Sequence, residues 1–117
     1  MPLKRLIELN TKDCLWVYIL RILEDGPTHG YSIRKEIEKR FGFRPGTVTA
    51  YKVLYLLSKS GFVKKTVSGR QKVYAITPAG KKALKGAEDF YRSRAKVLQA
   101  GRVSRGQGAF KGKKLKY

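Results

Sequence analysis

The segment from Lys12 to Glu24 most restricts the folds open to this chain, because it has the length of a helix and is apolar on most of its sides. Its apolar residues cover most of the helical circumference: Leu15, Val17, Tyr18, Ile19, Leu20, Ile22 and Leu23. Such a helix is stable in water only when other elements surround it. We therefore expect a central helix that ends at Asp25-Gly26-Pro27.

Two further helices are predicted after this break. Thr28 is expected to cap the first, which runs to about Arg40 and ends at Gly42. The second spans about Gly46 to Ser60, with Thr47 as a candidate cap, and has a core-facing stripe made of Ala50, Val53, Leu54 and Leu57. Its opposite face presents Val48, Lys52, Tyr55 and Lys59, flanked by Thr49, Tyr51 and Leu56.

A basic hairpin and a long helix follow. The strands are expected at 62–67 and 71–76, joined by a turn at Ser68, Gly69 and Arg70. The cations of the hairpin are Lys64, Lys65, Arg70 and Lys72. Thr77 and Pro78 are typical of a helix start, and the helix they begin reaches about Ala100.

These elements predict an α+β, mainly α chain organised as a winged helix-turn-helix with a long C-terminal helix. We expect four parts, namely a lead segment at 1–10, a winged-helix domain at 11–77, a helix at 78–100 and a disordered tail rich in Gly and Lys at 101–117. Along the last helix Leu84, Ala87, Tyr91 and Leu98 fall at three-four spacing, with Arg94 interrupting the apolar stripe between the last two.

The charge balance indicates a polyanionic partner. The chain carries 27 Lys and Arg against 8 Asp and Glu, a net charge of +19, whereas a small domain needs only roughly 2 to 8 for solubility. Anionic lipids also collect such charge. The longest apolar run, 14–20, falls short of the ~18 residues of a membrane span, and the first ten residues do not have the pattern of a secretory signal. We expect a cytoplasmic, nucleoid-associated protein with no membrane partner.

The sequence does not favour an enzyme. It has no phosphate-binding glycine loop, no nucleophile elbow and no carboxylates set among groups that would tune them, so we expect no catalytic residue and no cofactor. The sole histidine, His29, lacks Cys or carboxylate neighbours at metal-ligand spacing, so no metal site is expected. A local hydrogen bond or a DNA-facing role fits His29 better.

Double-stranded DNA is the expected partner, with the helix at 46–60 in the major groove and the hairpin on the backbone. An aromatic ring between two lysines, as at Tyr55, can pack on a sugar or a thymine methyl while the ammonium groups meet phosphates. The predicted contact residues are Val48, Thr49, Tyr51, Lys52, Tyr55, Lys59, Lys64, Lys65, Arg70 and Lys72. Three functions stay open: a sequence-specific regulator, a sequence-tolerant chromatin or architectural protein, and an RNA-binding component of a ribonucleoprotein.

The stretch from Leu15 to Leu84 resembles the PadR-like family of winged-helix transcriptional regulators, which is close to the MarR-like group. The residues that carry the resemblance lie at the start of the second helix, in the third helix and after the hairpin: Gly26-Pro27-Thr28-His29-Gly30-Tyr31, Tyr51-Lys52-Val53-Leu54 with Leu57 and Gly61, and Lys72-Val73-Tyr74-Ala75-Ile76-Thr77-Pro78-Ala79-Gly80.

The resemblance implies a homodimer formed by helices outside the winged core. The dimer contacts it implies here are Leu84, Ala87, Tyr91 and Leu98, together with Leu3, Leu6 and Ile7 of the lead segment. It also implies a role for Tyr51 near the start of the recognition helix. The sequence does not indicate whether an effector ligand binds.

Overall fold

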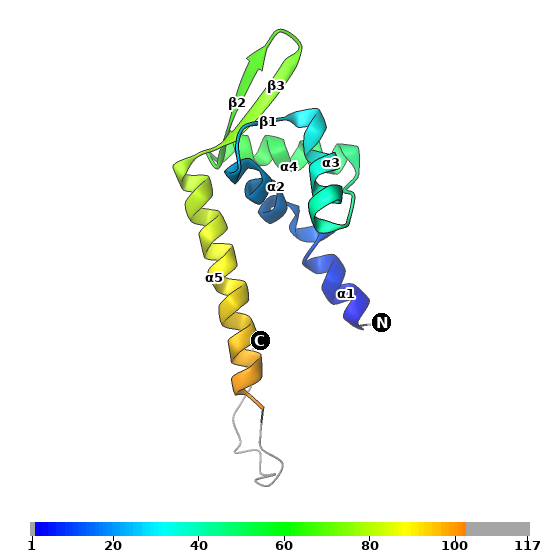
Figure 1. Ribbon diagram of the computed structural model, residues 1–117, viewed down its shortest axis with the longest axis vertical. Helices are drawn as coiled ribbons and strands as arrows, with labels where there is room; N and C mark the ends of the chain where they lie inside the picture. Colours follow the sequence, from blue (N-terminus) through cyan, green and yellow to red (C-terminus); the bar gives the residue numbers. More distant parts are fainter. Residues whose placement is uncertain (1, 103–117) are drawn as a thin grey trace. The chain divides into compact units, whose positions relative to one another are not determined.

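A computed structural model describes residues 2–102 of the chain (Figure 1). The tail predicted at 101–117 lies, from residue 103 onward, outside the described residues. Along the chain the elements are α1 (Pro2–Leu9), the 3-10 turn η1 (Lys12–Cys14), α2 (Leu15–Glu24), β1 (Thr28–His29), α3 (Gly30–Phe41), α4 (Thr47–Lys59), β2 (Val63–Ser68), β3 (Gln71–Ile76) and α5 (Pro78–Ala100). The predicted fold class, a mainly helical winged helix-turn-helix, is confirmed.

Two compact units divide the described chain, at residues 2–87 and 88–102, and each is described by itself. In the first unit α2 is the central element, as its sequence predicts. It contacts α3, α4 and β3 and contributes four of the least exposed side chains: Ile19, Leu20, Ile22 and Leu23. The core is completed by Ile33 and Ile37 of α3, Ala50, Leu54 and Leu57 of α4, Val63 and Tyr74 of the sheet, and Leu84 of α5.

The sheet contains one more strand than the sequence predicts. Its order is β1-β3-β2 and all pairs are antiparallel. Thr28, expected as a helix cap, lies in β1 opposite Tyr74, and its hydroxyl donates to the Gly26 carbonyl over 3.0 Å. The helix start moves to Gly30, with His29 at the cap position, because the extended backbone of residues 28 and 29 pairs with β3.

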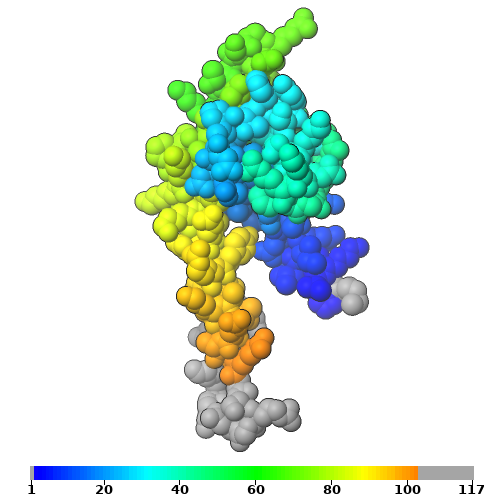
Figure 2. All heavy atoms as spheres, viewed as in Figure 1, coloured from blue at the N-terminus to red at the C-terminus, as the bar shows by residue number. Residues whose placement is uncertain are grey.

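The hairpin β2–β3 turns through two residues. Ser68 pairs with Gln71, so the loop consists of Gly69 and Arg70. Gly69 has φ +61°, a conformation that glycine adopts without strain and that a type II′ hairpin turn needs at its first position. The turn places Arg70 at the tip of the hairpin, which projects beyond the helices of this unit (Figures 1 and 2).

The start of α5 is fixed to the turn between α4 and β2. The Thr77 hydroxyl accepts a hydrogen bond from the Gly80 amide over 3.1 Å and donates one to the Gly61 carbonyl over 2.7 Å. The predicted Thr77 cap is therefore confirmed. Gly80 packs so closely that a Cβ there would lie 2.2 Å from the Phe62 carbonyl oxygen.

The first part of α5 belongs to the core. Leu84 is only 2% exposed, and Ala87 packs half-buried against the same cluster. The expectation that Leu84 faces a partner subunit is wrong, because its burial is complete within its own chain. No helix in residues 2–102 combines the length and apolar character needed to cross a bilayer.

Two glycines of α5 provide a test of this packing. We expect Gly80→Ala to lower the free energy of unfolding by about 1–3 kcal/mol, because its methyl overlaps the Phe62 carbonyl. The control is Gly86→Ala in the same helix, where nothing lies within 4 Å of an added Cβ, and helix propensity predicts a gain of about 0.5–1 kcal/mol. Urea denaturation followed by circular dichroism measures both, and equal effects of the two changes would contradict the close contact.

Candidate nucleic-acid interface

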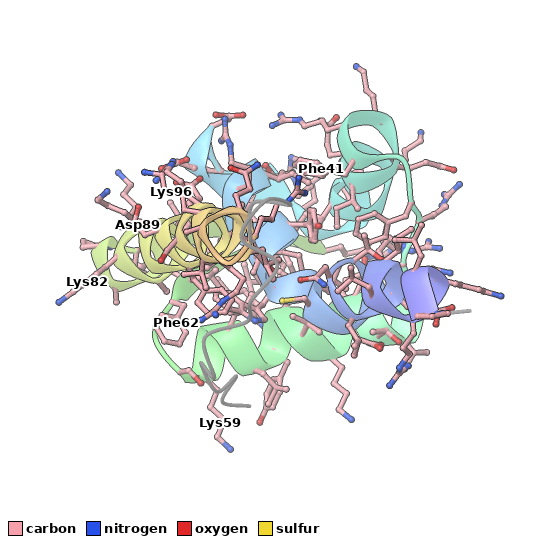
Figure 3. All side chains as sticks on the ribbon, turned by 90° about the horizontal axis from the view of Figure 1, so that it is seen from below. Phe41, Lys59, Phe62, Lys82, Asp89 and Lys96 are labelled. Carbon is pink, nitrogen blue, oxygen red and sulfur yellow. The ribbon has the colours of Figure 1, made fainter. Side chains whose placement is uncertain are left out.

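One face of α4 is exposed, and it is the face that the sequence predicts. Its side chains include Val48, Tyr55 and Tyr51, which are 82%, 59% and 39% exposed, together with the exposed Thr49, Lys52 and Lys59. The Lys59 ammonium lies 5.9 Å from the centre of the Tyr55 ring, and Figure 3 shows Lys59 pointing away from the helix. Gly46 occupies the cap position and no side chain caps the helix, so the expected cap by Thr47 is not present.

The register of the hairpin sorts its cations between two faces. Lys65 lies opposite Tyr74, and Lys72 lies opposite Val67. Because side chains alternate along a strand, Lys65 and Lys72 share the face of the buried Tyr74 ring. Lys64 lies opposite Ala75 and occupies the other face. The structure thus brings Lys65 and Lys72, but not Lys64, to the side that packs on the helices.

Two pockets join α4 to the hairpin. One, of about 310 Å³, is lined by Tyr55, Ser58, Lys59, Lys65 and Tyr74. The other, of about 200 Å³, is lined by Gly30, Tyr31, Tyr51, Arg70 and Lys72. The exposed face of α4 and the inner face of the hairpin therefore form one continuous surface, called here the basic face, which consists of Tyr31 and the predicted contact residues except Lys64.

Tyr31 belongs to the basic face but is not one of the contact residues predicted from the sequence. It is 63% exposed and stacks on His29, with ring centres 5.2 Å apart and an interplanar angle of 18°. A large aromatic residue in the first turn of the helix before the recognition helix is the signal that would have identified it, because that turn lies beside the start of the recognition helix in this fold.

Acidic residues are segregated from the basic face. Residues 39–87 contain no Asp or Glu. Within residues 2–102, no carboxylate lies within 4.0 Å of Lys52, Lys59, Lys65, Arg70 or Lys72. The ion pairs lie elsewhere. Asp25, for example, accepts hydrogen bonds from Arg21 and Arg40, which lower the pKa of its carboxyl.

Tyr74 connects the hairpin to the helices beneath it. Only 4% of it is exposed, and burial, followed by the proximity of Tyr51, raises the pKa of its hydroxyl. A Cβ at Gly30 would lie 3.0 Å from Tyr74 and 3.3 Å from Tyr51. The absence of a side chain at residue 30 is what allows both rings to pack against the start of α3.

The remaining predicted partner contacts lie outside this face. In the unit of residues 88–102, Tyr91 is 38% and Leu98 69% exposed. In α1, which has no buried residue, Leu3, Leu6 and Ile7 are more than half exposed. Within the described residues, no group of three or more His, Cys, Asp or Glu side chains could hold a metal ion.

Solved structures of regulators have a similar fold. A transcriptional regulator from Clostridium thermocellum is 28% identical, with a TM-score of 0.66 over 73% of this chain and 86% of its own. A PadR family transcription regulator from Clostridium difficile is 26% identical, with a TM-score of 0.65 over 73% of this chain and 94% of its own.

A relative found by sequence is a longer protein, and this chain matches only part of it. It is an uncharacterised 37.1 kDa protein in transposon TN4556 of Streptomyces fradiae, which is 39% identical over 67 residues. The match covers 56% of this chain but 19% of that protein, so the chain spans about a fifth of the length of this curated relative.

The family assignment rests on a match over more than half of the chain. Residues 19–86 fit the model of the transcriptional regulator PadR-like family, and this range includes α3, α4, the whole sheet and the buried start of α5. The chain therefore belongs to the PadR-like family of winged-helix transcriptional regulators.

Proposed function

We propose that this chain is a homodimeric regulator that binds duplex DNA, with α4 in the major groove and the β2–β3 hairpin on the phosphate backbone. The observation that carries the proposal is the basic face, in which exposed cations and tyrosines from α3, α4 and the hairpin adjoin and no carboxylate from residues 2–102 pairs with the cations. Such a surface matches the charge and the groove geometry of B-DNA.

The side chains divide into two roles under this proposal. Lys59, Lys65, Arg70 and Lys72 supply affinity through phosphates, which do not report sequence. Thr49, Tyr51, Lys52 and Tyr55 occupy the part of α4 that enters the groove and supply the sequence preference, with Val48 as an apolar contact for a thymine methyl. Lys64, on the other face of the hairpin, contributes only to the general electrostatic attraction.

Sequence-tolerant binding to DNA is the second candidate. It is favoured by the five lysines and arginines of the basic face, which have no carboxylate partner among residues 2–102 and can all bind phosphates whatever the base sequence. Double-stranded RNA fits less well, because its deep and narrow major groove does not admit a helix such as α4.

Homodimerisation is supported by hydrophobic surfaces that residues 2–102 of one chain leave exposed. Every residue from 88 to 100 is exposed, including the large hydrophobics Phe90, Tyr91, Val97 and Leu98. A helical segment of this length is marginal in water without packing. A second copy, related by a two-fold axis, would cover these side chains and set two α4 helices about one turn of DNA apart, roughly 34 Å.

The proposed division of roles is testable with two substitutions. We expect Arg70→Ala to weaken binding to all duplexes by a similar factor, about tenfold or roughly 1.4 kcal/mol. Tyr55→Ala should instead change the ratio of affinities between a selected and a random duplex by about fivefold, or roughly 1 kcal/mol. Fluorescence anisotropy with both duplexes and a double-stranded RNA measures these values, and parallel losses on every nucleic acid would favour sequence-tolerant binding.

The dimer is testable in the unit of residues 88–102. Leu98→Glu places a charge in the proposed contact and should raise the dimer dissociation constant by about 30-fold, or roughly 2 kcal/mol. Lys96→Glu introduces the same side chain at an exposed position about 100° or more around the helix from Phe90, Tyr91, Val97 and Leu98, and it should leave the dimer intact. Analytical ultracentrifugation against the monomer mass of 13.3 kDa measures both. A wild-type monomer at micromolar concentration, or equal effects of the two changes, would contradict the proposal.

A further inference from the structure

The pocket of about 200 Å³ where α3, α4 and the hairpin meet has the composition of an anion site. Arg70 and Lys72 reach it from the turn and from β3, Tyr51 lines it from α4, and Gly30 and Tyr31 line it from the start of α3. Three separate elements thus contribute donors or an aromatic ring to one small volume.

The two cations of this pocket lack a protein anion. Neither Arg70 nor Lys72 has a carboxylate within 4.0 Å among the described residues, and no Asp or Glu occurs between residues 39 and 87. Two like charges that line one pocket repel each other, which is unfavourable unless an anion binds between them. An arginine fork beside a lysine matches the oxygens of a phosphate, which accept several hydrogen bonds at once.

The aromatic walls are held in place before any ligand arrives. Tyr31 is largely exposed, yet its ring is stacked on His29. Tyr51 packs against the start of α3, where a Cβ on Gly30 would come within 3.3 Å of it. A preorganised ring loses little conformational freedom on binding. The pocket therefore offers two aromatic rings, each in contact with another part of the fold, beside two long cationic side chains.

We propose that this pocket seats one phosphate of the DNA backbone, which Arg70 and Lys72 share, while the Tyr31 ring packs on the adjoining sugar. Tyr51 forms the wall of the pocket on the α4 side. His29 acts as a positioning residue that holds Tyr31. The inference rests on the proposed function. It adds one phosphate of defined position, held between the hairpin and α3, which would set the orientation of α4 in the groove.

Sharing has a measurable signature. For B-DNA, the logarithm of the binding constant falls with the logarithm of salt concentration with a slope of about −0.9 for each phosphate neutralised. If one phosphate is shared, Arg70→Ala and Lys72→Ala should each leave most of the slope in place, because the other cation remains. The double variant should then lose about 0.9 of slope, whereas two independent contacts would lose about 1.8.

The experiment measures anisotropy of a labelled 20-base-pair duplex with the full chain at four salt concentrations, for wild type, both single variants and the double variant. The control pair is Lys59→Ala with Lys72→Ala, since Lys59 lines the other pocket and its effect should simply add to that of Lys72. Thermal melts check folding, which should not change because both Arg70 and Lys72 are exposed. Tyr31→Ala should weaken binding about threefold or more without changing the slope.

The outcomes distinguish failure of the shared phosphate from failure of the proposed DNA-binding function. A slope loss in the Arg70/Lys72 double variant that exceeds the sum of the two single losses, with additive losses for the control pair, supports the shared phosphate. Additive slopes in both pairs, in a wild type that binds duplex, overturn the shared phosphate and leave the proposed function standing. A wild type that shows no duplex binding at 0.1 M salt overturns the proposed function, and the phosphate seat with it.

Discussion

The burial of α2 is the interaction on which the rest of this structure depends. Ile19 and Leu20 are fully buried, and Ile22 and Leu23 are 1% exposed, so each contributes about 1.5–3 kcal/mol of hydrophobic stabilisation. Because α2 is apolar on most sides, α3, α4 and β3 must each turn an apolar face toward it. For α4 this commits Ala50, Leu54 and Leu57 to the core and leaves the opposite face to solvent. The candidate reading surface is thus fixed by the packing of a different helix.

Charge segregation completes that surface. Asp25 and Glu36 pair with arginines of α2 and α3, and Glu38 pairs with Arg44. These exposed pairs contribute little to stability individually, but they neutralise the cations nearest to them. The cations Lys52, Lys59, Lys65, Arg70 and Lys72 have no such partner among residues 2–102, and they lie beside the exposed tyrosines of the basic face.

The sequence predicts those features that depend on local periodicity. The exposed face of α4 follows from its 100° repeat, and the hairpin follows from its alternation and its glycine turn. The strand β1 does not, because two extended residues gain stability only from pairing with Tyr74 and Val73, which are remote in sequence. The side on which Lys64 lies likewise needs the register of the hairpin. Helical periodicity assigns Leu84 and Leu98 to the same apolar stripe but does not tell what each one contacts. Leu84 packs in the core of its own chain, whereas Leu98 is exposed to solvent.

Tyr74 explains why the hairpin and the recognition helix act as one surface. Its backbone pairs with Thr28 on one side and with Lys65 on the other, while its buried ring lies against the start of α3 beside Tyr51. A hairpin joined to its domain only at its two ends would move independently of the helices. Here the central strand carries a ring anchored among three elements, so the base of the hairpin holds a fixed position relative to α4. A shared phosphate between Arg70 and Lys72 requires this rigidity, since the pocket exists only while α3, α4 and the hairpin keep their mutual positions.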